Sequence, residues 1–234
     1  MTLRMLPAGD RAVLLHTGDL ATTLALTAHL RQARIPEIED LIPTSETVLV
    51  RLVPGVDIVG LGDRLLTVAT TATVEADDEG GGHPLVIPVR YDGPDLADVS
   101  SATGLSIQEV IQAHTGTHWR AAFVGFAPGF AYLAGDDSRL TVPRRAESRP
   151  NVAAGSVALA GEFSAVYPRQ SPGGWQVLGF TQKVLWDIDA EPPAAIQPGS
   201  WVQFVDIDAA EQRTAAEGGR ATEAAPPDRR TSEA

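Results

Sequence analysis

Apolar residues in the N-terminal part of the chain gather in short runs that have the length and composition of β-strands. Three such runs are Ala12–His16, Glu37–Ile42 and Thr47–Val53. A fourth, Leu85–Tyr91, follows a stretch at 75–84 that is acidic and rich in glycine and that we predict to be a linker. If the fourth run belongs with the first three, the runs predict one sheet.

Two longer segments between these runs carry apolar residues at helical spacing. Asp19 is a candidate N-cap for the segment 20–34, and Pro36 follows the end of that segment. Asp57 takes the same place before the segment 58–72. The resulting order of strand, helix, strand, strand, helix and strand is typical of a small ferredoxin-like α/β domain.

The pattern changes along the second half of the chain. Two short helical segments are predicted first, and Ser106 and Glu109 have the spacing of a capping box at the start of the second. From Trp119 onward, short apolar runs alternate with turns rich in glycine and proline about every ten residues, which predicts a compact sandwich or barrel. The fold class is therefore α+β, and the predicted parts are an N-terminal α/β domain at 1–82, a β-barrel domain at 83–210 and a disordered tail at 211–234.

Composition excludes several classes of function. The 234 residues carry a formal net charge of −12, which disfavours binding to a nucleic-acid backbone. Cysteine is absent, so disulfides, thiol catalysis and cysteine–zinc sites are excluded. No stretch approaches the ~20 apolar residues of a membrane span, and proline, glycine and aspartate interrupt any signal peptide. We expect a cytoplasmic protein that binds neither nucleic acid nor membrane.

The sequence GFAPGFAYL, Gly125–Leu133, is the first candidate site. Its two glycines permit positive φ and its proline stiffens the turn, so aromatic rings would flank exposed main-chain N–H groups. Such a loop suits a planar amide or a carboxylate, and the alternative is a hairpin whose aromatic residues simply pack in the barrel. The residues that this hypothesis places in a substrate or phosphate site are Gly125, Phe126, Pro128, Gly129, Phe130 and Tyr132.

Three arginines in the sequence VPRRAESRP form the second candidate. The guanidinium groups of Arg144 and Arg149 suit the oxygens of phosphate or of a substrate carboxylate, with Arg145 beside them. The alternative is a solvated loop in which the arginines pair with nearby acidic residues, namely Asp136, Asp137 and Glu147.

A third candidate is the turn that precedes Trp175. We predict either a facing loop that approaches the ligand, a seam with a partner protein, or an ordinary connection between two strands. The residues of this segment are Ser171, Pro172, Gly173, Gly174, Trp175 and Gln176.

Other polar residues give weaker signals. His114 and His118 have helical spacing, but Gly116 lies between them and no third ligand is evident, so we interpret them as structural and expect no metal. Glu162 is interpreted as a surface carboxylate. The chain has no phosphate-binding loop, no dinucleotide fingerprint and no serine nucleophile elbow. The sequence leaves the catalytic residues unknown.

The run GFAPGFAYL, VPRR and SRPNVAAGSVALAGEFSAVYPRQSPGGWQVLG, with the earlier GDRAVLL, IPVRYDGPDL and EVIQAHTGTHW, resembles one known family. The family is known variously as the B subunit of 5-oxoprolinase, the KipI kinase inhibitor and allophanate hydrolase subunit 1, and is of the carboxyltransferase subdomain C and D type. The resemblance extends to about Ile207. It implies a small α/β domain followed by a cyclophilin-like β-barrel.

The resemblance also implies a function. Family members act with a C subunit, which is an allophanate hydrolase subunit 2-like chain, and with a third subunit as an ATP-dependent 5-oxoprolinase, which opens the lactam of 5-oxoproline to glutamate. ATP with magnesium is then the expected cofactor, bound here or by the partner, and no biotin is expected on this chain. Two alternatives stay open: an inhibitor that binds a sensor histidine kinase, and half of a carboxyltransferase of the urea carboxylase type.

Overall fold

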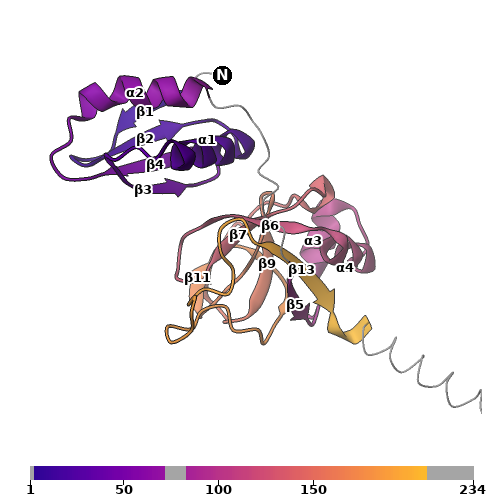
Figure 1. Ribbon diagram of the computed structural model, residues 1–234. Helices are drawn as coiled ribbons and strands as arrows, with labels where there is room; N and C mark the ends of the chain where they lie inside the picture. The colour runs from indigo at the N-terminus through magenta and orange to yellow at the C-terminus, as the bar shows by residue number, and fades with distance from the viewer. Residues whose placement is uncertain (1–2, 72–82, 210–234) are drawn as a thin grey trace, which may run out of the picture. The chain divides into compact units, whose positions relative to one another are not determined.

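The computed structural model describes residues 3–71 and 83–209, which fall into two compact units (Figure 1). The first lies within Met1–His83 and the second within Pro84–Ala234. The predicted tail at 211–234 and most of the predicted linker at 75–84 lie outside the described residues. No helix in the described ranges is both long and apolar enough to cross a membrane.

The first unit contains an antiparallel sheet with the strand order β1-β2-β4-β3. Apolar side chains alternate along the strands, so that one sheet face forms the core of the unit with residues such as Val13, Leu15 and Val50. The strands are β1 (Arg4–Pro7), β2 (Ala12–His16), β3 (Ile38–Pro43) and β4 (Thr47–Leu52).

Helices α1 (Leu20–Ala33) and α2 (Ile58–Thr71) complete this core with Leu26, Leu30 and Leu65. Both predicted helix starts are confirmed. The side chain of Asp19 accepts a hydrogen bond from the main-chain N–H of Thr22 at 2.8 Å, as an N-cap does. Main-chain N–H of Gly60 donates to Asp57 at 3.2 Å in the same way.

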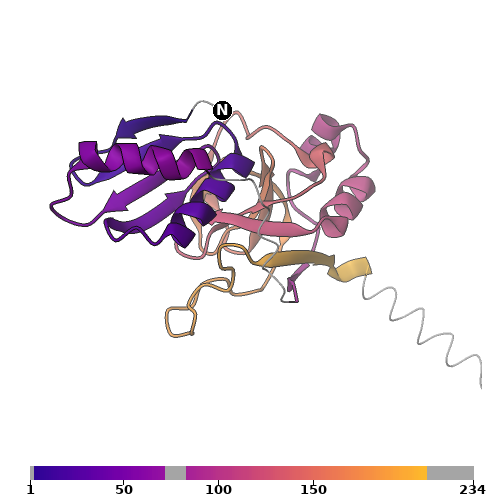
Figure 2. The same ribbon diagram turned by 45° about the horizontal axis from the view of Figure 1, so that its top comes forward.

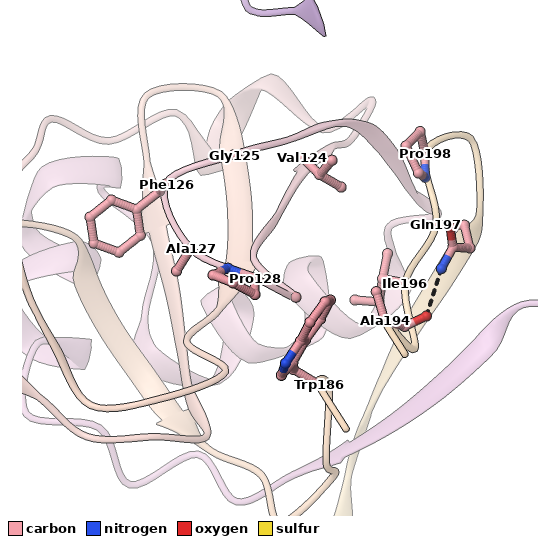
Figure 3. Close-up of a pocket in the computed structure, with 11 residues that line it drawn as sticks. Val124, Gly125, Phe126, Ala127, Pro128, Trp186, Ala194, Ile196, Gln197 and Pro198 are labelled. Carbon is pink, nitrogen blue, oxygen red and sulfur yellow. Dashed lines mark hydrogen bonds between the residues drawn. The ribbon is translucent and has the colours of Figure 1, made fainter. Parts of the chain in front are cut away.

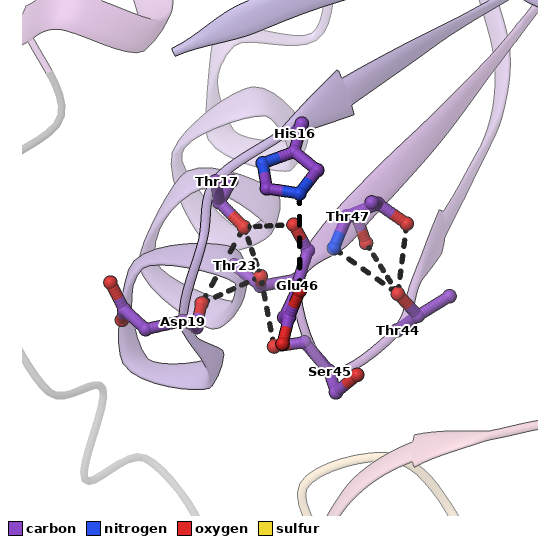
Figure 4. A network of polar contacts seen from close by, with 8 residues as sticks. All are labelled: His16, Thr17, Asp19, Thr23, Thr44, Ser45, Glu46 and Thr47. Carbon is purple, nitrogen blue, oxygen red and sulfur yellow. Dashed lines mark hydrogen bonds and ion pairs between the residues drawn. The ribbon is translucent and has the colours of Figure 1, made fainter. Parts of the chain in front are cut away.

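Threonine hydroxyls tie the start of α1 to the turn between β3 and β4 (Figure 4). The Thr17 hydroxyl lies 2.5 Å from the Thr23 hydroxyl and donates to the carbonyl of Glu46 at 2.6 Å. The Thr23 hydroxyl donates to the carbonyl of Asp19 at 2.8 Å. These polar groups are satisfied within the unit, so we interpret the network as structural.

The strand β5 (Leu85–Val89) does not complete the first unit, which corrects the conditional assignment of Leu85–Tyr91 to its sheet. It belongs to the second unit, where it pairs in parallel with β13 (Trp201–Asp206). The fourth strand of the first sheet is β1, which the apolar pattern did not reveal because Arg4 and Pro7 interrupt it. The element order is therefore strand, strand, helix, strand, strand, helix.

Two short helices follow β5 in the second unit and pack on its sheet, α3 (Leu96–Thr103) and α4 (Ile107–Gly116). The predicted capping box at the start of α4 is confirmed: Ser106 and Glu109 exchange hydrogen bonds between side chain and main chain. Buried residues of both helices, including Val99 and Val110, join the apolar core of the sheet.

The second unit is built on a sheet with the order β12-β9-β10-β7-β6-β13-β5. The sheet curls into the barrel shape visible in Figures 1 and 2, which confirms the predicted barrel. A separate ribbon pairs β8 (Arg149–Val152) with β11 (Ser171–Gly173). The remaining strands are β6 (Trp119–Val124), β7 (Ala131–Ala134), β9 (Ser156–Ala160), β10 (Phe163–Val166) and β12 (Gln176–Phe180).

Main-chain contacts join the two edges of this sheet. Arg90, which follows β5, exchanges hydrogen bonds of 2.9 Å in both directions with Phe180 at the end of β12. Two glycines allow this approach, because a Cβ atom at Gly179 would lie 2.2 Å from the Arg90 carbonyl oxygen, and one at Gly93 would lie 2.3 Å from the Val177 oxygen. The closure places Asp95 directly beside β12.

Candidate functional site

We call the segment 142–150, which carries the three arginines, the arginine loop. It is held by Asp95, whose side chain is 1% exposed. Arg149 binds this carboxylate through both terminal nitrogens, at 2.8 and 2.7 Å, and Arg145 Nη1 binds it at 2.5 Å. The main-chain N–H of Val177 donates to the same carboxylate at 2.7 Å. Asp95 therefore fastens the loop to β12 and to the start of α3.

Electrostatics keep Asp95 ionised. Burial alone would raise the pKa of its carboxyl, but the hydrogen bonds from Arg149 and Val177 and the charges of both arginines outweigh burial, so the pKa lies below its usual range. The hydrogen bonding with Asp95 in turn raises the pKa of Arg149. The pair is charged across the physiological range.

The structure separates the three arginines. Arg149 and Arg145 are about a quarter exposed and are engaged with Asp95, whereas Arg144 is exposed. The acid that pairs with them was not among those expected, because Asp137 pairs with Arg139 instead. Arg144 is thus the cation of this loop that is best placed to meet a ligand. The ligand roles predicted for Arg144 and Arg149 stay predictions.

The sequence APGF forms a tight turn at the tip between β6 and β7. The main-chain N–H of Phe130 donates to the carbonyl of Ala127 at 3.0 Å, and Gly129 has φ +78° after Pro128. Proline followed by a residue of positive φ is the arrangement of a type II turn. A Cβ atom at Gly129 would lie 2.8 Å from the Cβ of Trp186, so glycine is required here on two grounds.

Phe126 has a strained backbone. Its φ is +66°, and the main-chain N–H of Ala127 donates to the carbonyl of Gly125 at 2.7 Å, which makes Phe126 the centre of a γ-turn. Its side chain is 60% exposed. A bulky residue rarely adopts positive φ, and such strain is concentrated at functional sites.

Two substitutions of Phe126 measure this strain. Both Phe126→Gly and Phe126→Ala delete the ring, but only alanine retains the cost of positive φ. We expect the glycine variant to be more stable than the alanine variant by about 1 kcal/mol, the reverse of their usual order. Chemical denaturation of both variants checks this, and an alanine variant that is the more stable would show that the turn is unstrained.

The rings of GFAPGFAYL pack into an aromatic cluster in the barrel. Phe130, which is 1% exposed, lies at its centre and contacts Tyr132, Tyr167 and Trp175 at centroid distances of 5.2, 5.3 and 5.5 Å. Edge-on geometry predominates, as aromatic rings prefer. The members are Phe123, Phe126, Phe130, Tyr132, Phe163, Tyr167 and Trp175. Phe130 is therefore a packing residue, while Phe126 remains at the surface.

The turn before Trp175 is mostly buried. Within Ser171–Gln176, Pro172 is exposed and Gly173 is half-buried, whereas the other four residues are buried. The main-chain N–H of Arg145 donates to the carbonyl of Gly174 at 2.8 Å, which joins this turn to the arginine loop. The predicted facing or seam role stays a prediction.

Tyr167 is where the three candidate segments meet. Its ring lies 6.4 Å from that of Phe126, and a Cβ at Gly173 would lie 2.3 Å from its hydroxyl. Burial raises the pKa of Tyr167, partly offset by a main-chain hydrogen bond with Trp175 and by the nearby charges of Arg144 and Arg149. Exposed Phe126 thus contacts a buried, neutral tyrosine, and the charge of exposed Arg144 lowers the pKa of the same tyrosine. We call Phe126, Arg144 and Tyr167 the aromatic–arginine site.

The loop Val124–Gly129 also lines a pocket of about 390 Å³ (Figure 3). Its far wall is a segment that sequence reasoning did not single out, 186–198. The side chain of Gln197 is held there by its bond to the carbonyl of Ala194 at 2.7 Å. The apolar lining includes Val124, Pro128, Trp186, Ile196 and Pro198.

His114 is a core residue. It is fully buried, and its ring nitrogens are bonded to the hydroxyls of Tyr91 at 2.7 Å and Ser164 at 2.9 Å. His118 is exposed, so the two histidines do not share an environment. Glu162 is exposed as well. Among the described residues, no group of three or more histidine or acidic side chains could hold a metal ion.

Comparison with known families decides the affiliation. A family described as "Carboxyltransferase domain, subdomain C and D" matches residues 3–196. The chain belongs to this family. The match spans both units, and it includes the loop at Gly125–Phe130, the arginine loop and the wall formed by Trp186.

Three curated proteins similar to this chain are named as the B subunit of 5-oxoprolinase. The protein of that name from Bacillus subtilis is 40% identical over 58% of this chain and 58% of its own length. The one from Escherichia coli O157:H7 is 44% identical over 51% of this chain and 56% of its own length. The aligned part thus spans little more than half of these relatives.

Solved structures support the fold. TTHA0988 is 35% identical with a TM-score of 0.67, and the match covers 84% of this chain and 40% of that one. The urea carboxylase of Kluyveromyces lactis gives a TM-score of 0.69 at 16% identity, over 92% of this chain and 22% of that one. The second likeness bears on the fold alone.

Proposed function

We propose that this chain is one component of a 5-oxoprolinase-type hydrolase that opens the lactam of 5-oxoproline to glutamate. The relatives named as the B subunit of 5-oxoprolinase support the proposal. The observation that links the proposal to particular residues is the contact of exposed Phe126 with the buried ring of Tyr167, whose pKa the charge of exposed Arg144 lowers.

This arrangement suits a small cyclic amide that carries a carboxylate. The guanidinium of Arg144 can bind the carboxylate, and the Phe126 ring can cover one face of the lactam. The γ-turn fixes the main chain of Phe126 before the ligand arrives, so less freedom is lost on binding. In this proposal the chain binds and orients the substrate, and it supplies no nucleophile.

The hydrolysis of a stable lactam requires activation, for which ATP is the expected co-substrate. Magnesium at a nucleotide site is usually held by one or two carboxylates together with the phosphates, and no such ligand set can be named among the described residues of this chain. In this proposal the nucleotide and its metal are bound by the partner chains, which are the allophanate hydrolase subunit 2-like protein and a third protein. No step of the reaction is routed through ATP on this chain.

Reconstitution tests the proposal. The purified chain, mixed with the allophanate hydrolase subunit 2-like protein and the third protein, should release phosphate from ATP only when 5-oxoproline is present. Each protein alone should be inactive. Turnover of ATP that ignores 5-oxoproline, or a complete mixture with no turnover, would contradict the proposal.

A second candidate is half of a carboxyltransferase, and the family description favours it. In that case a biotin-linked carboxyl group would be transferred to urea or a related amide. The same reconstitution separates the two, because a carboxyltransferase half would support transfer from carboxybiotin and would not respond to 5-oxoproline.

A further inference from the structure

Arg144 lies between residues whose main chains are fixed by hydrogen bonds. Before it, the main chain of Val142 exchanges hydrogen bonds of 3.1 and 2.7 Å with that of Gly161. After it, the main-chain N–H of Arg145 donates to the carbonyl of Gly174 at 2.8 Å. Arg144 itself is exposed, so a cation that can meet a ligand is carried on a short stretch of chain with little freedom to move.

The residue directly before Arg144 is held by a buried side chain, that of Gln176 at the start of β12. Its Nε2 donates to the main-chain carbonyl of Pro143 at 3.3 Å. Gln176 is 8% exposed, and its buried Oε1 accepts no hydrogen bond from any residue that the structure describes. A buried amide whose oxygen lacks a donor costs stability, so packing alone does not explain a glutamine at this position. The contact with Pro143 does explain it.

The neighbours of Gln176 in sequence also contact the site or the residue that fastens the arginine loop. The main chain of Trp175 is hydrogen-bonded to Tyr167, the buried tyrosine of the aromatic–arginine site. The main-chain N–H of Val177 donates to Asp95 at 2.7 Å. The chain around Gln176 is therefore fixed on both sides, and its side chain can hold Pro143 in a defined place.

From these contacts we infer that Gln176 is a positioning residue of the aromatic–arginine site and holds Arg144 where its guanidinium can bind the carboxylate of the substrate. The bond to Pro143 fixes the carbonyl that precedes Arg144, so less freedom of the main chain is lost when the ligand binds. Gln176 is buried and acts on the substrate only through Arg144. The inference rests on the proposed function for the identity of this substrate.

Gln176→Met tests the inference, because methionine has a similar volume and removes both the bond to Pro143 and the oxygen that lacks a donor. The midpoint of thermal unfolding should be unchanged or higher. In the reconstituted mixture, the KM for 5-oxoproline should rise about fivefold or more while kcat is unchanged. Gln203→Met, at a half-buried position on β13, is the matched control and should leave KM and kcat unchanged. Gln176→Leu repeats the test with a second apolar side chain.

A double-mutant cycle shows whether Gln176 acts through Arg144. In a chain that already carries Arg144→Gln, the further change Gln176→Met should raise the KM no more, because the group that Gln176 positions is gone. Increases in KM that multiply independently would overturn the inference. A lower unfolding midpoint together with an unchanged KM would show that Gln176 only supports the fold, and would overturn it as well.

Hydrogen exchange separates this outcome from that of the proposed function, because it requires neither partner nor substrate. The main-chain N–H of Arg145 should exchange about threefold faster or more in Gln176→Met than in the unaltered chain or in Gln203→Met. If exchange is faster while the reconstituted mixture ignores 5-oxoproline, Gln176 holds the loop and the proposed reaction fails. If the mixture is active and neither exchange nor KM changes, the reaction stands and the inference fails.

Discussion

Asp95→Ala is expected to lower the free energy of unfolding by about 3 to 5 kcal/mol, the cost of removing one partner from a buried ion pair. The carboxylate accepts hydrogen bonds from Arg145, from both terminal nitrogens of Arg149 and from Val177, so its loss leaves four donors without this acceptor. Because both arginines remain about a quarter exposed, water can reach them and the lower end of the range is expected. Urea unfolding at neutral pH measures the effect.

Asp98 provides the control for this prediction. It lies on the same helix, 3.7 Å from Arg145, but its side chain is 67% exposed. Asp98→Ala should therefore cost less than about 1 kcal/mol. Equal losses in the two variants would show that Asp95 does not anchor the arginine loop.

Acid should destabilise the protein through His114. Burial lowers the pKa of this histidine to about 3, from about 6.5 in an exposed chain. Between these two values the unfolded chain binds a proton that the native protein does not, so the free energy of unfolding falls as the pH falls. The slope should approach about 1.4 kcal/mol per pH unit in this range, and the contribution is fully present above about pH 6.5.

His114→Phe should remove this slope, although the loss of bonds to Tyr91 and Ser164 should also lower stability at neutral pH. His118→Asn, at an exposed position, should leave the slope unchanged. If His114→Phe does not fold, NMR titration of the unaltered protein decides the matter. A His114 resonance that titrates near pH 6 would contradict the account.

Local chemistry explains which elements could be predicted from the sequence. The N-cap at Asp19 and the capping box at Ser106 depend on residues within three positions of each other, and both were predicted correctly. Strands such as β2 and β9 were evident because uninterrupted apolar runs mark them. The barrel was predicted from short apolar runs that alternate with turns rich in glycine and proline.

Long-range pairing explains what could not be predicted. The partner of β5 is β13, more than a hundred residues later, so no local pattern predicts this pairing. Asp95 likewise meets Arg145 and Arg149 only after the barrel closes at Gly93 and Gly179.

The residues of the candidate site also divide into those that the sequence revealed and those that only the fold brings together. The two loops with glycine, proline and arginine were visible in the sequence. In the structure Phe126 contacts the ring of Tyr167, and the charges of Arg144 and Arg149 lower the pKa of that tyrosine. Tyr167 lies in the short apolar run SAVYP, which predicts a strand and gives no sign of a site. Trp186 lies in a segment without regular periodicity, and only the folded chain places it in the same pocket as Pro128.

The central claim is that the aromatic–arginine site binds the substrate of an assembled hydrolase. Its most direct test is the 5-oxoproline-dependent release of phosphate by the reconstituted mixture with Arg144→Gln, compared with Arg169→Gln, an exposed arginine outside the site. We predict a KM for 5-oxoproline raised at least tenfold by Arg144→Gln and unchanged by Arg169→Gln. An Arg144→Gln mixture with the KM and turnover of the unaltered one would contradict the claim.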